Sequence, residues 1–425
     1  MKRVVVTGCG VVSPIGSGKN KFFNSLAQGK SGVDTITLFD ATTFPVRIAG
    51  EVKDLDYGRV LETYPSAKSI IDRKVFLGLS AIREALEDSQ VGEEILKRER
   101  VGINFGVSLE VLPIEEFFKS SESLNDGSHN IYSNLIKNKK SLQTPLDATN
   151  RIVIEKHKIS GPDFVNCSAC AASAQALGHS FQMVKRGDAH VFICGGFDSM
   201  LNPLGIGGFS LLGALSTKNE LKGAACRPFD AKRDGAVLGE GAGIVVIEEL
   251  EHALKREAEI YCEIVGFGSS LDAYKPTDPD PEGEGAAAAI SMALQSAQLS
   301  PDRIDYINAH GTSTPKNDEI ETKAIKNVFG SRAYKIPVSS TKSMIGHLIA
   351  ASGVVEFISC LLGFEKNLIP PTINYDKKDP YCDLDYVPNQ SREWQGEYIL
   401  SNSFGFGGQN ACLIMKRWSD GNEAY

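Results

Sequence analysis

A single cysteine stands where a helix is expected to begin, in surroundings that favour a nucleophile. Cys170 lies in the run Asn166 to Ala176, in which small residues follow the turn-forming pair Gly161 and Pro162. A thiolate at a helix N-terminus is favoured by the helix dipole, and small neighbours let a substrate carbonyl approach. A cysteine considered alone is more often a buried structural thiol. Cys170 is therefore a candidate nucleophile whose assignment needs partner groups.

Cys167 and Cys170 also form a C-x-x-C pair. A zinc site of this kind needs a second pair of ligands, and the sequence has no second C-x-x-C. The residues around the pair also differ from a redox motif. We therefore expect neither a metal site nor a redox pair here.

Two histidines follow patterns that would place imidazoles in a pocket. The apolar run Tyr306 to Ala309 predicts a strand that ends at His310, and a glycine follows at once. Lys342 and His347 flank Gly346 at the head of a helix of small residues. An imidazole can donate a hydrogen bond or move a proton near neutral pH. The alternatives are a satisfied histidine at a strand end and a solvated lysine.

A glycine-rich segment near the C-terminus has features of a mobile loop. Within the run Ser401 to Asn410, aromatic residues alternate with glycines, and Phe406 stands between Gly405 and Gly407. Glycines allow backbone N–H groups to approach a developing oxyanion. A plain glycine-rich turn is the alternative, and the spacing differs from that of a phosphate-binding loop.

The elements that must position these residues alternate between strands and helices, which implies an α/β architecture with covered sheets. The run Tyr261 to Gly268 repeats the strand-to-glycine pattern of the N-terminus. This repeat hints at an internal duplication with a boundary near residue 258. Strands are expected at Arg3–Val12, Val101–Phe105, His190–Cys194, Gly243–Glu248 and Tyr261–Val265, and helices at Arg73–Ser89, Ala171–Lys185, Gly285–Ala297 and Glu319–Val328.

Composition narrows the class of protein. The 425 residues are 42% hydrophobic and 23% charged, which is ordinary for a globular protein. The formal net charge of −8 argues against general binding to nucleic acid. Nine cysteines without regular spacing do not form a disulfide framework. The sequence has no signal peptide and no apolar run near the roughly 20 residues that cross a membrane, so we expect a soluble, cytoplasmic protein without a membrane partner.

In this order, the four segments resemble the elongating β-ketoacyl-acyl-carrier-protein synthases of the thiolase-like superfamily. The similarity runs from Val4–Gly8 to Gly405–Gly408, essentially the whole chain. It implies a five-layer αβαβα fold of two similar halves, usually assembled as a dimer. The N-terminal half, residues 1–258, would carry the nucleophilic cysteine, and the C-terminal half, residues 259–425, would carry the two catalytic histidines.

The resemblance also implies a role for each candidate residue. Cys170 would be the nucleophile, with His310 and His347 as the catalytic histidines and Lys342 holding their arrangement. Initiating synthases have asparagine at the position of His347, so the second histidine points to decarboxylative elongation. The supporting polar shell would be Asp318 and Glu321; the oxyanion hole and gate would be Phe406 with Gly405 and Gly407; substrate contacts would come from Thr312, Thr314 and Phe209.

Substrates in this family travel on the phosphopantetheine of an acidic acyl carrier protein, and no metal or redox cofactor is implied. An acidic carrier would dock against basic residues of this chain. Many relatives carry an arginine at the position of Gly213, so this position does not supply a basic side chain here. Surface lysines are equally often merely solvated. The candidate docking residues are Lys68, Arg73, Lys74, Lys139 and Lys140.

Two strings bear on the pathway. The string Asn317 to Thr322 is closer to the ketosynthase subunits of type II polyketide synthases, and Asn104 to Val111 is less glycine-rich than its fatty-acid counterpart. These two segments favour polyketide synthesis over housekeeping fatty-acid elongation. In polyketide synthesis we expect a heterodimer with a cysteine-lacking partner of the chain-length-factor type. A non-catalytic subunit is disfavoured by Cys170, and a non-decarboxylating thiolase is disfavoured by His347.

Overall fold

The strands form one mixed sheet to which both halves of the chain contribute. The computed structural model describes residues 1–109 and 144–419. Within these residues, the first half supplies β1 (Val4–Ser13), β5 (Val101–Gly106), β6 (Asp163–Asn166), β7 (Val191–Ser199) and β8 (Glu240–Glu249). The second half supplies β9 (Cys262–Leu271), β10 (Tyr306–Asn308), β11 (Val338–Ser339), β14 (Tyr398–Gly405) and β15 (Gln409–Arg417).

The two sets of strands share one topology. Across the sheet, the first set runs β6, β5, β7, β8, β1 and the second runs β11, β10, β14, β15, β9. In each set the first three strands run parallel to one another. The fourth strand is antiparallel to the third, and the fifth is antiparallel to the fourth. The sets meet where β1 pairs antiparallel with β9, from Val4 opposite Ile264 to Val6 opposite Cys262. The chain thus has the two similar halves that were expected, whereas a division at residue 258 stays a prediction.

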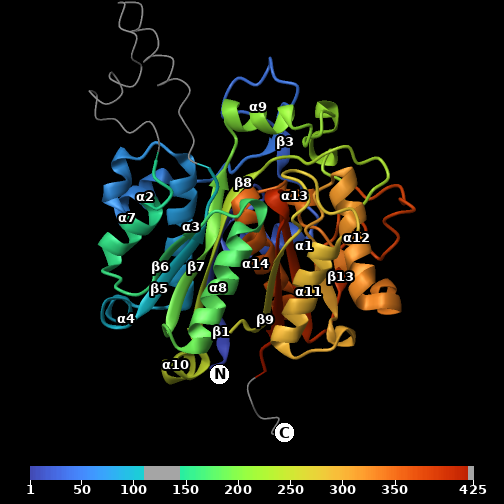
Figure 1. The fold of residues 1–425 in the computed structure, drawn as a ribbon. Coiled ribbons are helices and arrows are strands. Elements are labelled where there is room, and N and C mark those ends of the chain that lie inside the picture. The colour runs from blue at the N-terminus through green and yellow to red at the C-terminus, as the bar shows by residue number, and fades with distance from the viewer. Residues whose placement is uncertain (110–143, 420–425) are drawn as a thin grey trace, which may run out of the picture.

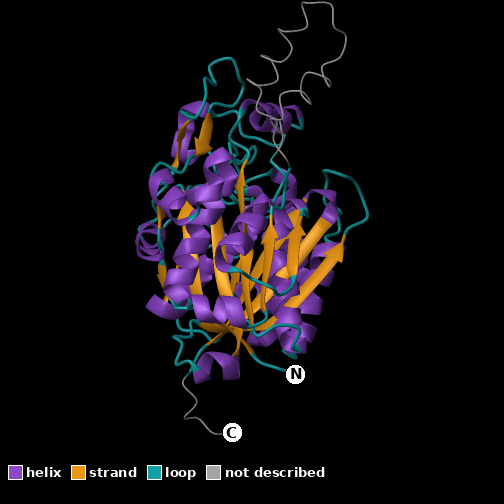
Figure 2. Ribbon diagram, turned by 90° about the vertical axis from the view of Figure 1, so that its left-hand side faces the viewer, coloured by secondary structure: helices purple, strands orange, loops and turns teal. Residues whose placement is uncertain are grey.

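Helices form three layers around the strands. On one outer side lie α3 (Arg73–Ser89) and α7 (Ala148–His157), and on the other lie α11 (Glu284–Ala297) and α12 (Pro315–Phe329) (Figure 1). Between the two halves of the sheet lie α8 (Ala172–Arg186) and α14 (Ser352–Lys366). Figure 2 shows the strands flanked by helices in the perpendicular view. This order of layers is the expected αβαβα architecture.

The strands are buried on both faces because alternate side chains enter different cores. On β8, Ile244 and Val246 pack with residues of α3, whereas Val245 and Ile247 pack with residues of α8 and α14. Burial of one such side chain contributes about 1.5–3 kcal/mol. This apolar packing therefore holds α8 and α14 between the two halves of the sheet, and both helices begin beside the site described below.

One strand extends farther than the sequence predicted. The expected strand His190–Cys194 is observed as β7, which continues through Gly195 and Gly196 to Ser199. A Cβ at Gly195 would lie 2.2 Å from the Gly243 carbonyl oxygen, so glycine allows the close approach to β8 there. The glycines thus serve strand packing rather than ending the strand.

Shorter elements complete the described residues, in which we find no helix long and apolar enough to cross a membrane. They are β2 (Gly16–Ser17), α1 (Lys19–Ala27), β3 (Val33–Thr35), β4 (Ile48–Gly50), α2 (Tyr57–Thr63), α4 (Glu93–Arg98), α9 (Pro203–Leu211), α10 (Leu250–Lys255), α13 (Lys342–Ile345), β12 (Leu368–Ile369) and β13 (Arg392–Glu393).

Candidate active site

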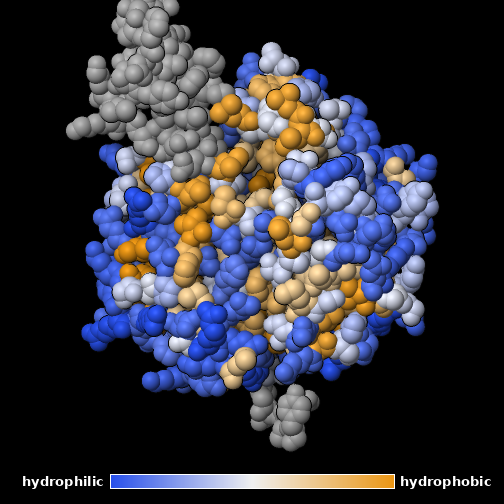
Figure 3. Space-filling model, in the orientation of Figure 1, coloured by the Kyte–Doolittle hydropathy of each residue, from blue (hydrophilic) through white to orange (hydrophobic). Residues whose placement is uncertain are grey.

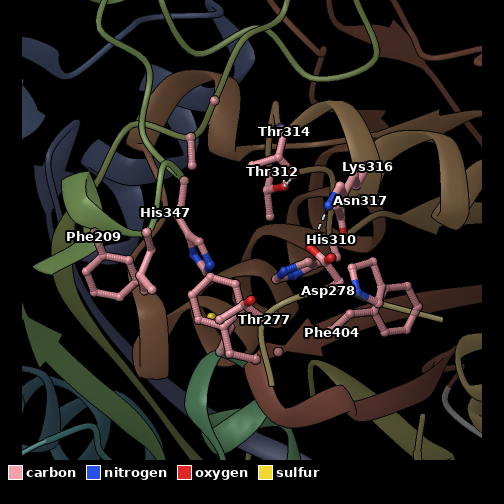
Figure 4. A pocket seen from close by; sticks show the side chains of 18 of the residues that line it. Phe209, Thr277, Asp278, His310, Thr312, Thr314, Lys316, Asn317, His347 and Phe404 are labelled. Carbon is pink, nitrogen blue, oxygen red and sulfur yellow. Dashed lines mark hydrogen bonds and ion pairs between the residues drawn. The ribbon is translucent and has the colours of Figure 1, made fainter. Parts of the chain in front are cut away.

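The cysteine and both histidines singled out in the sequence line one cavity of about 370 Å³. Cys170 comes from the first half of the chain, and His310 and His347 come from the second. In Figure 4 the two imidazoles point into the same space. Their ring centroids are 5.3 Å apart and the ring planes meet at 83°. The fold thus brings together three residues that are up to 177 positions apart in sequence (347 minus 170).

Cys170 lies in the 3-10 turn Ala169–Ala171, which leads directly into α8. Its side chain is buried, and burial raises the pKa of the Cys170 thiol to about 12. The charge of Lys342 and the backbone N–H of Phe406 act in the opposite direction. The helix dipole was expected to favour the thiolate, but the loss of hydration outweighs it. Cys170 is therefore a thiol at neutral pH in the free protein.

The glycine-rich segment contacts the cysteine through its backbone. A Cβ at Gly405 would lie 3.0 Å from the Cys170 nitrogen, so glycine permits this approach. The backbone N–H of Phe406 also lies near the Cys170 sulfur, and hydrogen bonding from it lowers the pKa of the thiol. The backbone N–H groups of Cys170 and Phe406 thus both lie close to the Cys170 sulfur, and their role as an oxyanion hole stays a prediction.

Two carboxylates on α12 hold the segment that carries His310. Glu321 accepts hydrogen bonds from the N–H groups of His310 (2.8 Å) and Gly311 (2.7 Å). Asp318 accepts one from the N–H of Thr312 (3.0 Å). Since the carboxylates are three residues apart, they lie on one face of the helix. Both carboxylates accept backbone N–H groups and so hold the segment that follows β10.

The protonation state of His310 follows from its neighbour Lys342. The ammonium of Lys342 lies 3.2 Å from Nδ1 of His310 and forms a buried ion pair with Glu356 of α14. An ammonium only donates hydrogen bonds, so Nδ1 is the acceptor and Nε2 carries the proton. Burial, followed by the charges of Lys342 and His347, holds the pKa of His310 well below its usual value. His310 is therefore a neutral imidazole with a donor at Nε2.

The same tautomer is imposed on His347 by a different set of groups. Its Nδ1 accepts the N–H of Ile349 (3.3 Å) and lies 2.9 Å from the Ser352 hydroxyl. Burial, and then Lys342, hold the pKa of His347 well below the usual range. His347 is therefore also neutral, with its proton on Nε2. Two Nε2–H donors face one cavity.

The wider part of the cavity is lined by the expected substrate contacts. Thr312 and Thr314 lie on one wall, with their hydroxyls 2.8 Å apart. Phe209 of α9 stacks on Phe406, with ring centroids 6.1 Å apart and planes at 23°. Gly407 has φ of +78°, which favours glycine. The aromatic pair lies beside Cys170, where movement of Phe406 would change access to the thiol.

The expected docking residues differ in their environment. Lys68 is exposed, and Lys139 and Lys140 lie outside the described residues. Lys74 is only 2% exposed and donates to the carbonyl of Leu109 (2.6 Å). For Lys74 the prediction of a surface role is wrong, because its side chain is buried and its ammonium is already bonded to the Leu109 carbonyl and paired with Asp72.

Arg73 is also unsuitable for docking, because its guanidinium is committed inside the protein. It makes two hydrogen bonds to Glu240, of 2.8 and 2.7 Å, and Glu240 is fully buried. An additional acidic partner would have to compete with this bidentate pair. Arg73 therefore has a structural position, and Lys68 is the described residue that remains for docking.

Sequence reasoning missed Glu356, Ser352 and Asp198. Glu356 had a detectable signal, because it is an acidic residue inside the apolar helix Ser352–Lys366. Asp198 had none, because its contact with Ala350 joins segments that are distant in sequence. Ser352 lies only five residues after His347, but a serine at a helix start gives no sign that its hydroxyl meets an imidazole. Among residues 1–109 and 144–419, no group of three or more histidine, cysteine or acidic residues has the geometry of a metal site.

Comparison with known proteins agrees with this geometry. The family described as "Beta-ketoacyl synthase, N-terminal domain" matches residues 1–253, and "Beta-ketoacyl synthase, C-terminal domain" matches residues 261–376. The fold and site define a thiolase-like acyltransferase. The chain belongs to the β-ketoacyl synthase family.

Individual relatives match along the whole chain. A 3-oxoacyl-[acyl-carrier-protein] synthase 2 of Coxiella burnetii is 44% identical over 422 residues, 99% of each chain. A protein of the same name from Synechocystis is 41% identical over 420 residues, 98% of each chain. A solved type II polyketide synthase acyl-carrier protein in complex with its ketosynthase is similar with a TM-score of 0.86 and 35% identity, over 98% of this chain and 100% of that one.

Proposed function

We propose that this chain elongates acyl groups on an acyl carrier protein in fatty-acid synthesis, by decarboxylative condensation with a malonyl unit. The observation that carries the proposal is the convergence of Cys170 with two neutral histidines, His310 and His347, in one cavity. A thiol can hold an acyl group, and two uncharged N–H donors can stabilise an enolate without quenching it by proton transfer.

In the first step, the Cys170 sulfur attacks the carbonyl carbon of an acyl thioester. The N–H groups of Cys170 and Phe406 stabilise the tetrahedral oxyanion, the carbon–sulfur bond to phosphopantetheine breaks, and the proton of the cysteine leaves with the phosphopantetheine sulfur. The acyl group is then bonded to Cys170. Because the thiol pKa is high, we expect this proton transfer to accompany attack rather than to precede it.

In the second step, a malonyl thioester enters the same cavity and loses CO₂. The electron pair of the broken carbon–carbon bond forms an enolate, whose oxygen accepts the Nε2–H bonds of His310 and His347. The enolate carbon attacks the acyl carbonyl, and the bond to Cys170 breaks. The released thiolate takes one proton from solvent, which the net reaction consumes. The product is a β-ketoacyl thioester on the carrier. Removing one preorganised donor of this kind typically costs about 10²–10³ in rate.

We assign the pathway to fatty-acid elongation rather than to polyketide synthesis. Support comes from the full-length relatives at 44% and 41% identity, both named 3-oxoacyl-[acyl-carrier-protein] synthase 2. The polyketide ketosynthase is less similar, at 35% identity. The string Asn317 to Thr322 favoured the polyketide branch, but it is six residues long and lies on α12 at the rim of the cavity. Full-length similarity is the stronger guide.

The carrier must dock where the cavity opens, because its phosphopantetheine has to reach Cys170. Beside this mouth, α9 and the residue after it expose Leu204 (49%), Leu211 (92%) and Leu212 (56%). Figure 3 shows apolar side chains gathered over α9. Gly213 follows them with no side chain to form an ion pair. We propose that docking combines apolar contacts at α9 with basic groups that include Lys68.

We further propose a dimer of identical chains. Strand β6 pairs with β5 on one side, and within the described residues it is the last strand of the sheet. Such an edge presents unpaired backbone groups that a second copy can satisfy. Phe164 on this strand is 46% exposed, so it offers apolar area that a second copy could bury. A cysteine-lacking partner subunit is the competing possibility.

The test is elongation by the purified chain alone. Incubated with a saturated acyl carrier thioester and malonyl carrier, it should form a β-ketoacyl product two carbons longer, detected by mass spectrometry of the carrier. Cys170→Ala should abolish product, and Cys167→Ala should not. An inactive chain that makes polyketones only with a second ketosynthase-like subunit would place it in polyketide synthesis instead.

A further inference from the structure

Asp198 is a buried carboxylate that the condensation steps above do not use. It lies on β7 and is fully buried. One oxygen accepts the Ser108 hydroxyl (2.7 Å), and the other accepts the backbone N–H of Ala350 (3.0 Å). Ala350 belongs to the 3-10 turn Ile349–Ala351, between His347 and α14. Asp198 therefore links the first half of the chain to the turn that follows a catalytic histidine.

That turn contains an unfavourable backbone conformation. Ile349 has φ of +48°, in the left-handed region where a β-branched residue is strained. Such a conformation persists only where neighbouring contacts determine it. In this turn, the conformation of Ile349 is accompanied by two successive N–H groups that meet different acceptors. The Ile349 N–H meets Nδ1 of His347 (3.3 Å), and the Ala350 N–H meets Asp198.

We propose that Asp198 is a positioning residue for His347. By accepting the Ala350 N–H, it holds the turn in the conformation that presents the Ile349 N–H to Nδ1 of His347. This contact keeps the proton of His347 on Nε2, where the enolate needs it. The inference rests on the proposed function and adds a residue from the first half of the chain to the control of a histidine in the second.

Hydrogen bonding and charge at this position can be separated. The charged groups that act on Asp198 are Lys74 and Asp72, and burial raises the pKa of Asp198 to about 6. Its own charge raises the pKa of Cys170. Asparagine keeps an oxygen for Ala350 and an amide for Ser108 but removes the charge. Alanine removes both, so the two variants distinguish an acceptor from a charge.

The experiment measures CO₂ release from a malonyl carrier thioester and, separately, alkylation of Cys170 by iodoacetamide. Removing a preorganised donor costs roughly 10²-fold, so losing its positioning should lower CO₂ release by Asp198→Ala at least about tenfold. Alkylation should be no slower than in the wild type, because removing the charge of Asp198 lowers the pKa of Cys170. Asp198→Asn should recover most of the CO₂ release. The matched control Ser108→Ala removes the other hydrogen bond of Asp198 and should resemble the wild type. If Asp198→Ala does not accumulate, Asp198→Leu fills the space and removes the acceptor.

Three results would overturn the inference. Undiminished CO₂ release in Asp198→Ala shows that the turn holds without the carboxylate. Equal losses in Asp198→Asn and Asp198→Ala show that charge, not acceptance, matters. A parallel loss of alkylation and CO₂ release shows a general structural defect. A wild-type protein that releases no CO₂ from malonyl carrier contradicts the proposed function instead, so the two failures are distinguishable.

Discussion

Lys342 and His310 are in direct contact, with Nζ of the lysine 3.2 Å from Nδ1 of the imidazole. The same ammonium is paired with Glu356 in the central helix layer. The contact determines the tautomer of His310, and the ion pair gives the fully buried lysine an acidic partner. Catalytic geometry and the stability of the core are therefore coupled at Lys342.

Replacing Lys342 by methionine should damage both properties. Glu356 would be left as a buried carboxylate without its partner, which typically costs about 3–5 kcal/mol of unfolding free energy. His310 would lose the donor that fixes its tautomer, so condensation should fall by about a hundredfold. Denaturant unfolding and the condensation rate measure the two effects.

A double variant separates them. Lys342→Met with Glu356→Gln removes both charges, so much of the lost stability should return, because no unpaired charge remains in the core. Condensation should stay low, because nothing fixes His310. Recovery of activity together with stability would show that Lys342 acts only through folding.

His310→Ala and His347→Ala should each lower CO₂ release from malonyl carrier more than acyl loading of Cys170. Both residues are assigned to the enolate oxygen, and loss of one donor typically costs about 10²–10³ in rate. Loading measured by intact mass and CO₂ release measured in parallel test this. If loading falls as far as CO₂ release in either variant, the assigned role is wrong.

Gly407→Ala should slow acyl transfer about fivefold, because φ of +78° costs an alanine about 1 kcal/mol. No neighbouring atom would clash with the new Cβ, so stability should fall by no more than this strain, about 1 kcal/mol. Gly330→Ala is the matched control, since Gly330 also has positive φ and open space and lies away from the cavity. A similar slowing in both variants would argue against a gate at Phe406.

The rate of Cys170 alkylation should rise steeply with pH. Because burial raises the pKa of Cys170 to about 12, the thiolate fraction increases about tenfold per pH unit between pH 7 and 10. Iodoacetamide kinetics followed by intact mass measure this, with Cys170→Ala to subtract other sites. A plateau below pH 8 would mean that the helix dipole and Lys342 overcome burial.

The titration of His252 should change the stability of the folded protein with pH. His252 bonds the buried Glu248 and lies 3.0 Å from Glu99, and the hydrogen bond to Glu248 raises the pKa of His252. A raised pKa contributes stability that is complete below the unfolded value near 6.5 and is lost as pH rises through the folded value. His252→Gln should therefore lower the melting temperature more at pH 6 than at pH 9. His179→Gln, which affects a histidine with a lowered pKa, should show no such trend.

The sequence predicted the elements whose signals are local. The strand at Val101–Phe105 and the helix at Arg73–Ser89 are observed because apolar patterning and flanking residues decided them. Cys170, His310 and His347 could be singled out because each stands at the end of a strong pattern. Their convergence, however, came from the resemblance, since spacing alone does not bring residues of different halves together.

What the sequence could not provide are contacts between distant segments. Lys74 looked like a surface lysine, yet its acceptor, the Leu109 carbonyl, lies 35 residues away. Asp198 and Ala350 are 152 residues apart. The helix position of Cys170 is visible in the sequence, but the burial that raises the pKa of its thiol is not.

The identity of the acylated residue tests the account most directly. The purified chain would be incubated with an acyl carrier thioester in the absence of malonyl carrier, then analysed by intact mass spectrometry and peptide mapping. The account predicts one acyl group per chain, on Cys170, lost in Cys170→Ala and retained in Cys167→Ala. An acyl group on Cys167, or persistent labelling of Cys170→Ala, would contradict it.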